Sequence, residues 1–208
     1  MTYTFSSQLR QRLEQNLAAH SPDELDFTGH KQAAVAVTIV PGIGVENAAS
    51  MLLTKRTSRL NNHAGQWALP GGRIDEGESA LQGALREMHE EVNLQLDESS
   101  LLGRLDDLQT KSGYIITPFV FWAEDASSLR ANPDEVASIH HWPLSFFDGE
   151  ESIQFIEQDH TEMPLLRLNM GGSRIHAPTA AVLLQLWEVG VHGRHTRVRD
   201  YAQPDWAT

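Results

Sequence analysis

The chain has 208 residues and no cysteine, which excludes disulfide bridges, zinc–thiolate sites and thiol catalysis. It also lacks a long apolar run near its start: residues 1–20 hold no segment fit for a signal peptide or a membrane span. We therefore expect a soluble, cytoplasmic protein with no membrane partner. Basic residues are few, since 16 Lys and Arg stand against 28 Asp and Glu, for a net charge of −12. That balance argues against a nucleic-acid partner, although an acidic protein can bind phosphates through a cation.

The sequence does contain an ordered series of strand and helix signals, without repeats, low-complexity tracts or long linkers. Apolar and β-branched runs predict strands at residues 33–40, 51–56, 101–105, 114–123 and 138–142. Helical spacing predicts helices around Leu9, Leu13 and Leu17, at residues 79–92, and at about 178–189. This order predicts an α/β fold, a sandwich of helices on a mixed β-sheet.

We divide the chain into an N-terminal helical extension at residues 1–30, a main domain at 31–191 and a C-terminal tail at 192–208. The tail begins with a basic run, His192 to Arg199, in an otherwise acidic chain. Such a run is typical of a solvated tail. The alternative is that it lies over the site or a partner subunit and attracts an anionic substrate.

The predicted helix at 79–92 carries an unusual charge pattern. Its apolar residues share one side, and they are Leu81, Ala84, Leu85, Met88 and Val92. Glu87, Glu90 and Glu91 are expected together on a different side, where like charges repel. The cluster alone is compatible with a solvated acidic face. It is also compatible with a Mg²⁺ site, because Mg²⁺ prefers carboxylate oxygens and shares its other positions with substrate phosphates.

The residues upstream of this cluster favour the metal site. Gly72 is followed after five residues by Glu78, and after seven more by Arg86-Glu87-Met88-His89-Glu90-Glu91-Val92-Asn93-Leu94. This pattern resembles the Nudix box, the glycine-to-helix signature of Nudix hydrolases. Asn93 replaces the usual glycine after the helix, and asparagine is the substitute that best tolerates a left-handed backbone.

The resemblance implies a Nudix-type α/β/α sandwich that hydrolyses a nucleoside diphosphate linked to another moiety. It implies that Glu87, Glu90 and Glu91 bind the metal, that Glu78 supports the metal site, and that Arg86 orients the carboxylates. The expected cofactor is Mg²⁺, with Mn²⁺ as an alternative. A homodimer is expected from family habit.

The segment before the box resembles the coenzyme A diphosphatase branch of the family. It runs from the strand Leu52 to Arg56 through His63-Ala64-Gly65-Gln66 to Pro70-Gly71-Gly72. Coenzyme A or an acyl derivative is therefore the leading substrate. The alternatives are ADP-ribose, dinucleotides or damaged nucleotides, and a non-catalytic nucleotide-sensing module.

Several residues near the turn are candidates for substrate binding: Arg56, Arg59, His63, Gln66, Gly71 and Gly72. The two arginines suit phosphate oxygens, and the alternative is that they face water at a strand end. His63 and Gln66 offer hydrogen-bonding groups, or they brace the loop. For the general base, the candidates are Glu90 and Glu135, and the alternative for Glu135 is a loop surface.

Overall fold

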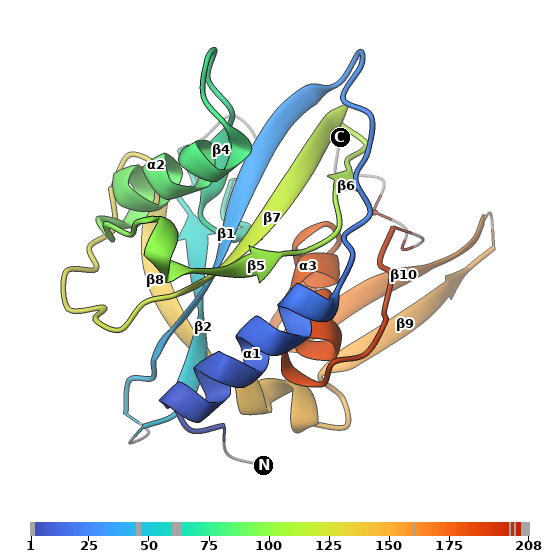
Figure 1. Ribbon diagram of the computed structural model, residues 1–208. Coiled ribbons are helices and arrows are strands. Elements are labelled where there is room, and N and C mark those ends of the chain that lie inside the picture. Colours follow the sequence, from blue (N-terminus) through green and yellow to red (C-terminus); the bar gives the residue numbers. More distant parts are fainter. Residues whose placement is uncertain are drawn as a thin grey trace.

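The computed structural model describes residues 3–44, 47–59, 64–159, 161–199, 201 and 203–204. A mixed sheet forms its centre, with strand order β3-β2-β1-β7-β5, and β4, β6 and β8 pair with β1, β7 and β2 (Figure 1). Its strands are β1 (Lys31–Pro41), β2 (Ala49–Arg56), β3 (Trp67–Ala68), β4 (Gly71–Arg73), β5 (Leu101–Arg104), β6 (Leu108–Gln109), β7 (Tyr114–Trp122) and β8 (Val136–Pro143). The long pair β1–β7 is parallel and the other pairs are antiparallel. All five strands predicted from the sequence are present, and the α/β fold with a mixed sheet is confirmed.

Helices cover both faces of this sheet. Helix α2 (Ala80–Val92) packs on one face, while α1 (Ser7–Ala19) and α3 (Thr179–Gln185) lie on the other (Figure 1). Strand β1 shows why two cores form, because Ala34 and Ala36 face α2 whereas Val37 and Ile39 face α1 and α3. Side chains alternate along a strand, so a nearly continuous apolar run fits a strand that is covered on both faces.

A second, three-stranded sheet was not predicted. It consists of β9 (Ile153–Gln158), β10 (Thr161–Met170) and β11 (Ser173–His176), in the order β11-β10-β9. A sequence signal for it exists: Gly171 and Gly172 follow the alternating Leu166, Leu168 and Met170. Both glycines have positive φ, 54° and 82°, as a two-residue hairpin turn with φ > 0 at both positions requires.

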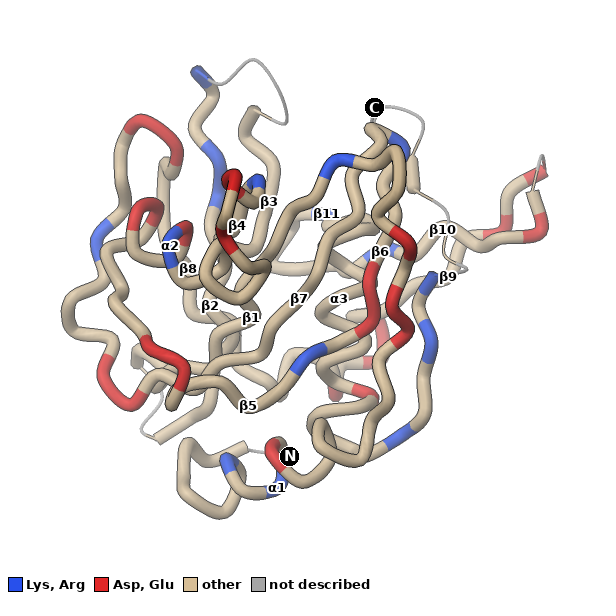
Figure 2. Tube along the Cα trace, turned by 45° about the horizontal axis from the view of Figure 1, so that its top comes forward, with Lys and Arg blue, Asp and Glu red and all other residues tan. Residues whose placement is uncertain are grey.

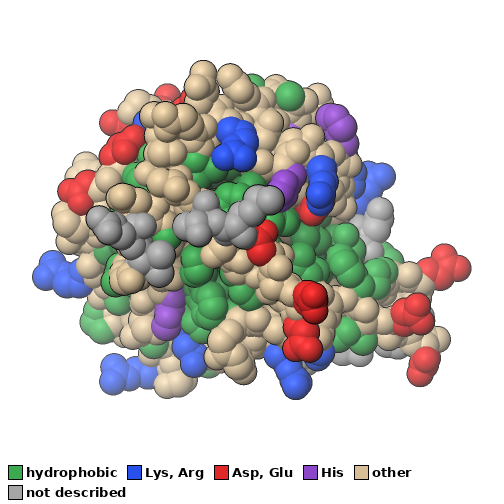
Figure 3. Space-filling view, turned by 90° about the horizontal axis from the view of Figure 1, so that it is seen from below, with side chains coloured by type: hydrophobic (Ala, Val, Ile, Leu, Met, Phe, Trp, Pro, Cys, Tyr) green, Lys and Arg blue, Asp and Glu red, His purple; other side chains and the backbone are tan. Residues whose placement is uncertain are grey.

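The hairpin of β9 and β10 projects from the body, and acidic side chains stand at its far end (Figures 2 and 3). At the other end of β11, the chain enters α3, which is shorter than predicted. It continues from Leu186 to Val191 in π-helical geometry.

The described part of the basic run is mostly solvent-exposed, as expected, but it is held against the body at several points. Val198 is 1% exposed. Arg197 Nη1 lies 2.6 Å from Asp106 Oδ1, and Arg194 Nη1 lies 2.8 Å from Glu188 Oε1. Among the described helices, none is long and apolar enough to cross a membrane.

Candidate active site

The carboxylates are carried by α2, and local signals set the ends of this helix. Ser79 caps the first turn: its side chain accepts from Gln82 N, and the Gln82 side chain accepts from Ser79 N in a capping box. Asn93 ends the helix with φ 56° and ψ 29°. The predicted left-handed residue after the helix is therefore confirmed.

Arg86 gathers three carboxylates around one guanidinium. Its Nε and Nη2 donate to the two oxygens of Glu78 at 2.9 and 3.0 Å, which is a bidentate pair. Its Nη1 donates to Glu87 Oε1 at 2.9 Å and to Glu90 Oε2 at 3.0 Å. Nη2 also donates to the carbonyl of Arg73, which ties the helix to β4. The hydrogen bond to Arg86 holds the pKa of Glu78 below its ordinary value.

Glu91 differs from the other two helix glutamates because it is buried, with 2% of its surface exposed. This corrects the expected arrangement of three glutamates on one polar side. Successive residues turn by 100°, so Glu91 lies on the side of Ala84 and Met88, seven and three residues earlier. Burial raises the pKa of Glu91 to about 8, although Arg56 opposes the shift and the Gly71 N–H donates to the carboxylate. Arg56 Nη1 lies 3.7 Å from Glu91 Oε1, beyond hydrogen-bond distance.

The turn at Gly71 and Gly72 has no room for side chains. A Cβ on Gly72 would lie 2.2 Å from Glu87 Oε1, and a Cβ on Gly71 would lie 2.4 Å from the Ala34 carbonyl oxygen. Glycine at 72 thus lets the Glu87 carboxylate lie against the backbone of β4. Burial raises the pKa of Glu87, and the neighbouring charges of Glu135 and Glu90 add to the shift.

Glu135 is brought to the helix by a loop whose backbone follows the end of α2. The N–H groups of Arg130 and Asn132 donate to the carbonyls of Val92 and Glu91 at 2.9 and 2.8 Å. The carbonyl of Glu135 accepts from Thr57 N at 2.9 Å. Its charge raises the pKa of Glu87 and Glu91, so it belongs to the same electrostatic cluster.

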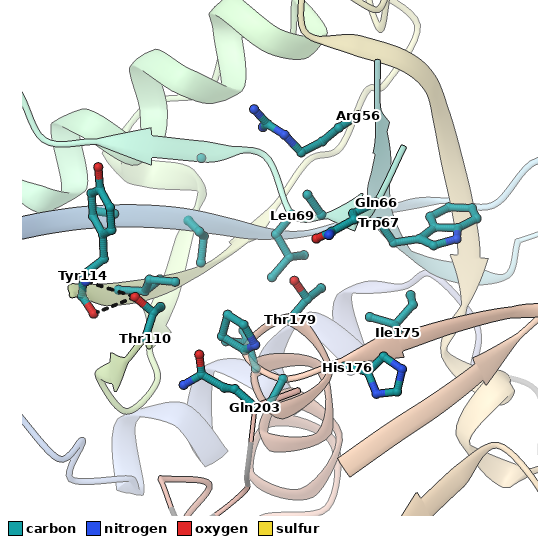
Figure 4. Close-up of a pocket in the computed structure, with 18 of the residues that line it drawn as sticks. Arg56, Gln66, Trp67, Leu69, Thr110, Tyr114, Ile175, His176, Thr179 and Gln203 are labelled. Atoms are coloured by element: carbon teal, nitrogen blue, oxygen red, sulfur yellow. Dashed lines mark hydrogen bonds between the residues drawn. The ribbon is translucent and has the colours of Figure 1, made fainter. Parts of the chain in front are cut away.

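A cavity of about 820 Å³ adjoins the cluster. One wall comes from β1, β3, β4 and the start of β7, and the other from β11, its junction with α3, and Gln203. Arg56, Gly71 and Gly72 contribute both to this cavity and to the surroundings of Glu87 and Glu91. Figure 4 shows Gln66 and Leu69 on one side of the space and Thr179 on the other.

The cavity is basic, although the protein is acidic. Its described lining holds Lys55, Arg56, Arg73 and Arg174, and it includes no Asp or Glu. The buried Nε of Arg56 has no hydrogen-bond partner among the described residues. An anionic ligand is the complement of such a lining.

The donors around α2 suit a hard divalent cation. Five carboxylates, those of Glu78, Glu87, Glu90, Glu91 and Glu135, stand against the two guanidinium groups of Arg56 and Arg86. Within the described ranges, no three acidic or histidine side chains are already gathered closely enough to hold a metal. The free oxygens of Glu87 and Glu90, together with the buried carboxylate of Glu91, are the oxygen ligands that such a cation takes.

The structure places the other predicted site residues as follows. Arg56, Gln66, Gly71 and Gly72 line the cavity, whereas Arg59 is exposed and is not part of the lining. His63 lies outside the described residues. The second wall, with Arg174, was missed along with its hairpin, and the Gly171-Gly172 turn signal was available to find it.

The fold and the site define a class: an α/β/α domain in which a carboxylate-bearing helix adjoins a basic cavity. The NUDIX domain family matches residues 31–158, and the chain belongs to this family. It is 40% identical over 117 residues to the uncharacterized Nudix hydrolase NudL of Photorhabdus laumondii, and 38% identical over 121 residues to NudL of Escherichia coli K12. These matches cover 56% of this chain in both cases, and 60% and 59% of the relatives' lengths. A MutT/nudix family protein from Enterococcus faecalis shares the fold, with a TM-score of 0.52 and 13% identity over 87% of this chain and 73% of that one.

Proposed function

We propose that this chain is a magnesium-dependent diphosphatase that cleaves a nucleoside diphosphate linked to another moiety, with coenzyme A or an acyl derivative as its substrate. The observation that carries the proposal is the junction of two features: the under-neutralised carboxylates of α2 and a basic cavity of about 820 Å³. Arg56 belongs to both. The names of the NudL relatives, which are called Nudix hydrolases, support the same reaction class.

The chain's own residues would act on the substrate as follows. Glu87, Glu90 and Glu91 would hold the metal, and Arg86 keeps the first two oriented while Glu78 anchors Arg86. A bound Mg²⁺ would neutralise charge on phosphoryl oxygens and acidify a water molecule. The guanidinium of Arg56, which is a quarter exposed and belongs to the cavity lining, would bind a phosphate oxygen that the metal leaves free.

We assign the general base to Glu135 rather than Glu90. Glu90 already accepts from Arg86 and is half exposed, whereas Glu135 is partly buried and carries no side-chain ion pair with a described residue. A base must reach the attacking water, and it typically contributes about 10² to 10⁴ in rate. Glu135→Gln should therefore lower kcat and flatten the acidic limb of the pH profile. If Glu90→Gln lowers kcat more than Glu135→Gln does, and the acidic limb of the pH profile is unchanged in Glu135→Gln, the general base is Glu90 instead.

Coenzyme A is favoured by the segment ahead of the box and by the cavity. Ligand sites of 300–1,000 Å³ enclose molecules much larger than a diphosphate, and 820 Å³ lies at the upper end of that range. Apolar lining residues such as Val35, Ile116 and Val182 would suit a pantetheine arm.

A substrate panel tests the proposal. Purified protein with Mg²⁺ is compared by kcat/KM on coenzyme A, acyl-coenzyme A, ADP-ribose, NADH and nucleoside triphosphates, and Mn²⁺ replaces Mg²⁺ in parallel. We expect coenzyme A compounds to rank first. A coenzyme A value far below the others rejects the substrate, and no product from any member rejects the enzyme.

A further inference from the structure

The far wall of the cavity is built by residues beyond the family's domain. The NUDIX match ends at residue 158, but β11, the start of α3 and Gln203 line the same cavity. Helix α2, which carries the carboxylates, and the turn at Gly71 and Gly72 lie on the opposite side. A ligand that extends from the carboxylates into this space therefore meets side chains from outside residues 31–158.

Arg174 is the charged residue of that wall. It lies in the middle of β11, where it pairs in register with Asn169 of β10, and its neighbour Ile175 is buried in the core. Arg174 is exposed, and both Arg174 and Ile175 contribute to the lining of the cavity. No described carboxylate pairs with it, although the chain has 28 acidic residues and pairs Arg104, Arg194 and Arg197 with acids elsewhere.

We propose that Arg174 binds a second anionic group of the substrate, a phosphomonoester outside the diphosphate that is cleaved. This inference deepens the proposed function and rests on it for the identity of the substrate. Arg56, on the metal side, is close enough to Glu91 to serve the diphosphate. Arg174 comes from the opposite wall of the same cavity, and Lys55 of β2 and Arg73 of β4 add two more positive charges to the lining. Coenzyme A carries a 3′-phosphate on its ribose, so its diphosphate could bind Arg56 on one side of the cavity while its 3′-phosphate binds Arg174 on the other.

Binding measurements test this without turnover. The probes are adenosine 3′,5′-bisphosphate and adenosine 5′-monophosphate, which differ by the one phosphate, titrated calorimetrically into the full chain in EDTA. A charge-assisted hydrogen bond predicts that the bisphosphate binds about ten- to a hundredfold more tightly. Arg174→Gln should reduce this ratio to about threefold or less and leave the affinity for the monophosphate nearly unchanged.

Two controls separate a specific contact from a general change of charge. Arg12→Gln removes the same unit charge from the exposed face of α1, far from the lining, and should keep the wild-type ratio. Arg174→Lys keeps the charge and should restore part of the ratio, and a thermal melt of each variant verifies the fold. A wild-type ratio near one, or an unchanged ratio in Arg174→Gln, overturns the proposal.

The same variants separate the two proposals when they are assayed with Mg²⁺ on coenzyme A and dephospho-coenzyme A. If the binding ratio behaves as expected but coenzyme A is not cleaved, the anion subsite is supported and the proposed function fails. If coenzyme A is cleaved but the binding ratio is one, the proposed function is supported and the subsite is rejected. NADPH and NADH are assayed in the same way. If NADPH is preferred over NADH by more than coenzyme A is preferred over dephospho-coenzyme A, and Arg174→Gln abolishes this preference, then the proposal that Arg174 binds a 3′-phosphate is rejected.

Discussion

The molecule has buried acids at two places, after β5 and on α2, and it supplies several hydrogen bonds, including one from an arginine, only to those after β5. Asp106 and Asp107, after β5, are each 1% exposed. Asp106 Oδ1 accepts from the backbone of Asp23 and contacts His20 and Arg197. Figure 2 shows the basic C-terminal segment running beside these acidic positions.

Asp107 is equally well supplied. Its oxygens accept from Arg104 at 2.6 Å, from the Thr117 hydroxyl at 2.8 Å and from Leu25 N at 3.0 Å. Glu91, by contrast, has one backbone donor and an arginine at 3.7 Å, and burial raises its pKa to about 8. Asp106 and Asp107, which stabilise the fold, therefore accept several hydrogen bonds and each contact a cation. A buried carboxylate that is left short of positive charge can receive a metal ion.

The largest effect that this comparison predicts is a loss of turnover in Glu91→Gln. The amide keeps the shape but carries no charge for a metal, so we expect kcat/KM to fall about a thousandfold, or ~4 kcal/mol of transition-state stabilisation. Circular dichroism and a thermal melt should show an intact fold. Near-normal turnover would reject Glu91 as a metal ligand.

The opposite result is expected for Asp107→Asn. The substitution removes the buried charge that Arg104 contacts at 2.6 Å and leaves the exposed Glu24 as the carboxylate partner of that guanidinium. Breaking a buried pair costs about 3 kcal/mol or more in the free energy of unfolding. Urea titration measures the change, with the exposed Asp159→Asn as the matched control. If both variants unfold at the same urea concentration, the aspartates do not stabilise the fold as described.

Gly72→Ala tests whether the turn positions Glu87. The added Cβ would lie 2.2 Å from Glu87 Oε1, so the carboxylate must move. Displacement of a catalytic group by about 1 Å can cost about a hundredfold in rate, and we expect a ten- to hundredfold fall in kcat. Combined with Glu87→Gln, Gly72→Ala should add little further loss, because both act through the same carboxylate. Fully additive losses would contradict this.

The smallest expected effect concerns stability and has a sign opposite to that of Asp107→Asn. In the metal-free protein, Glu91 has its pKa raised from 4.5 to about 8, so the folded state binds more protons than the unfolded state within that window. Stability should therefore fall as pH rises from 4.5 to about 8. Glu91→Gln removes this dependence and should make the metal-free protein more stable than the wild type at pH 8. Urea titrations at pH 5 and pH 8 measure it, and a destabilised variant at pH 8 would refute it.

Local patterns made much of the fold predictable. The helix at α2 follows from its apolar spacing and its Ser79 cap, and its end at Asn93 follows from a backbone preference. The five predicted strands follow from apolar runs. The hairpin at Gly171-Gly172 had the same kind of local signal, in its paired glycines and the alternating apolar residues before them, but it was not predicted.

The sequence by itself determined the carboxylates, their spacing on one helix and the glycine turn that precedes them, because these depend on residues within 23 positions of one another. Tertiary structure alone decided how far Glu91 is buried, that Arg56 lies near it, and that residues 173–179, Val182 and Gln203 close the cavity. The same is true of Asp106 and Arg197, which are 91 residues apart in the chain. Burial and long-range pairing depend on which surfaces the folded chain brings together, and a single sequence carries no direct record of those distances.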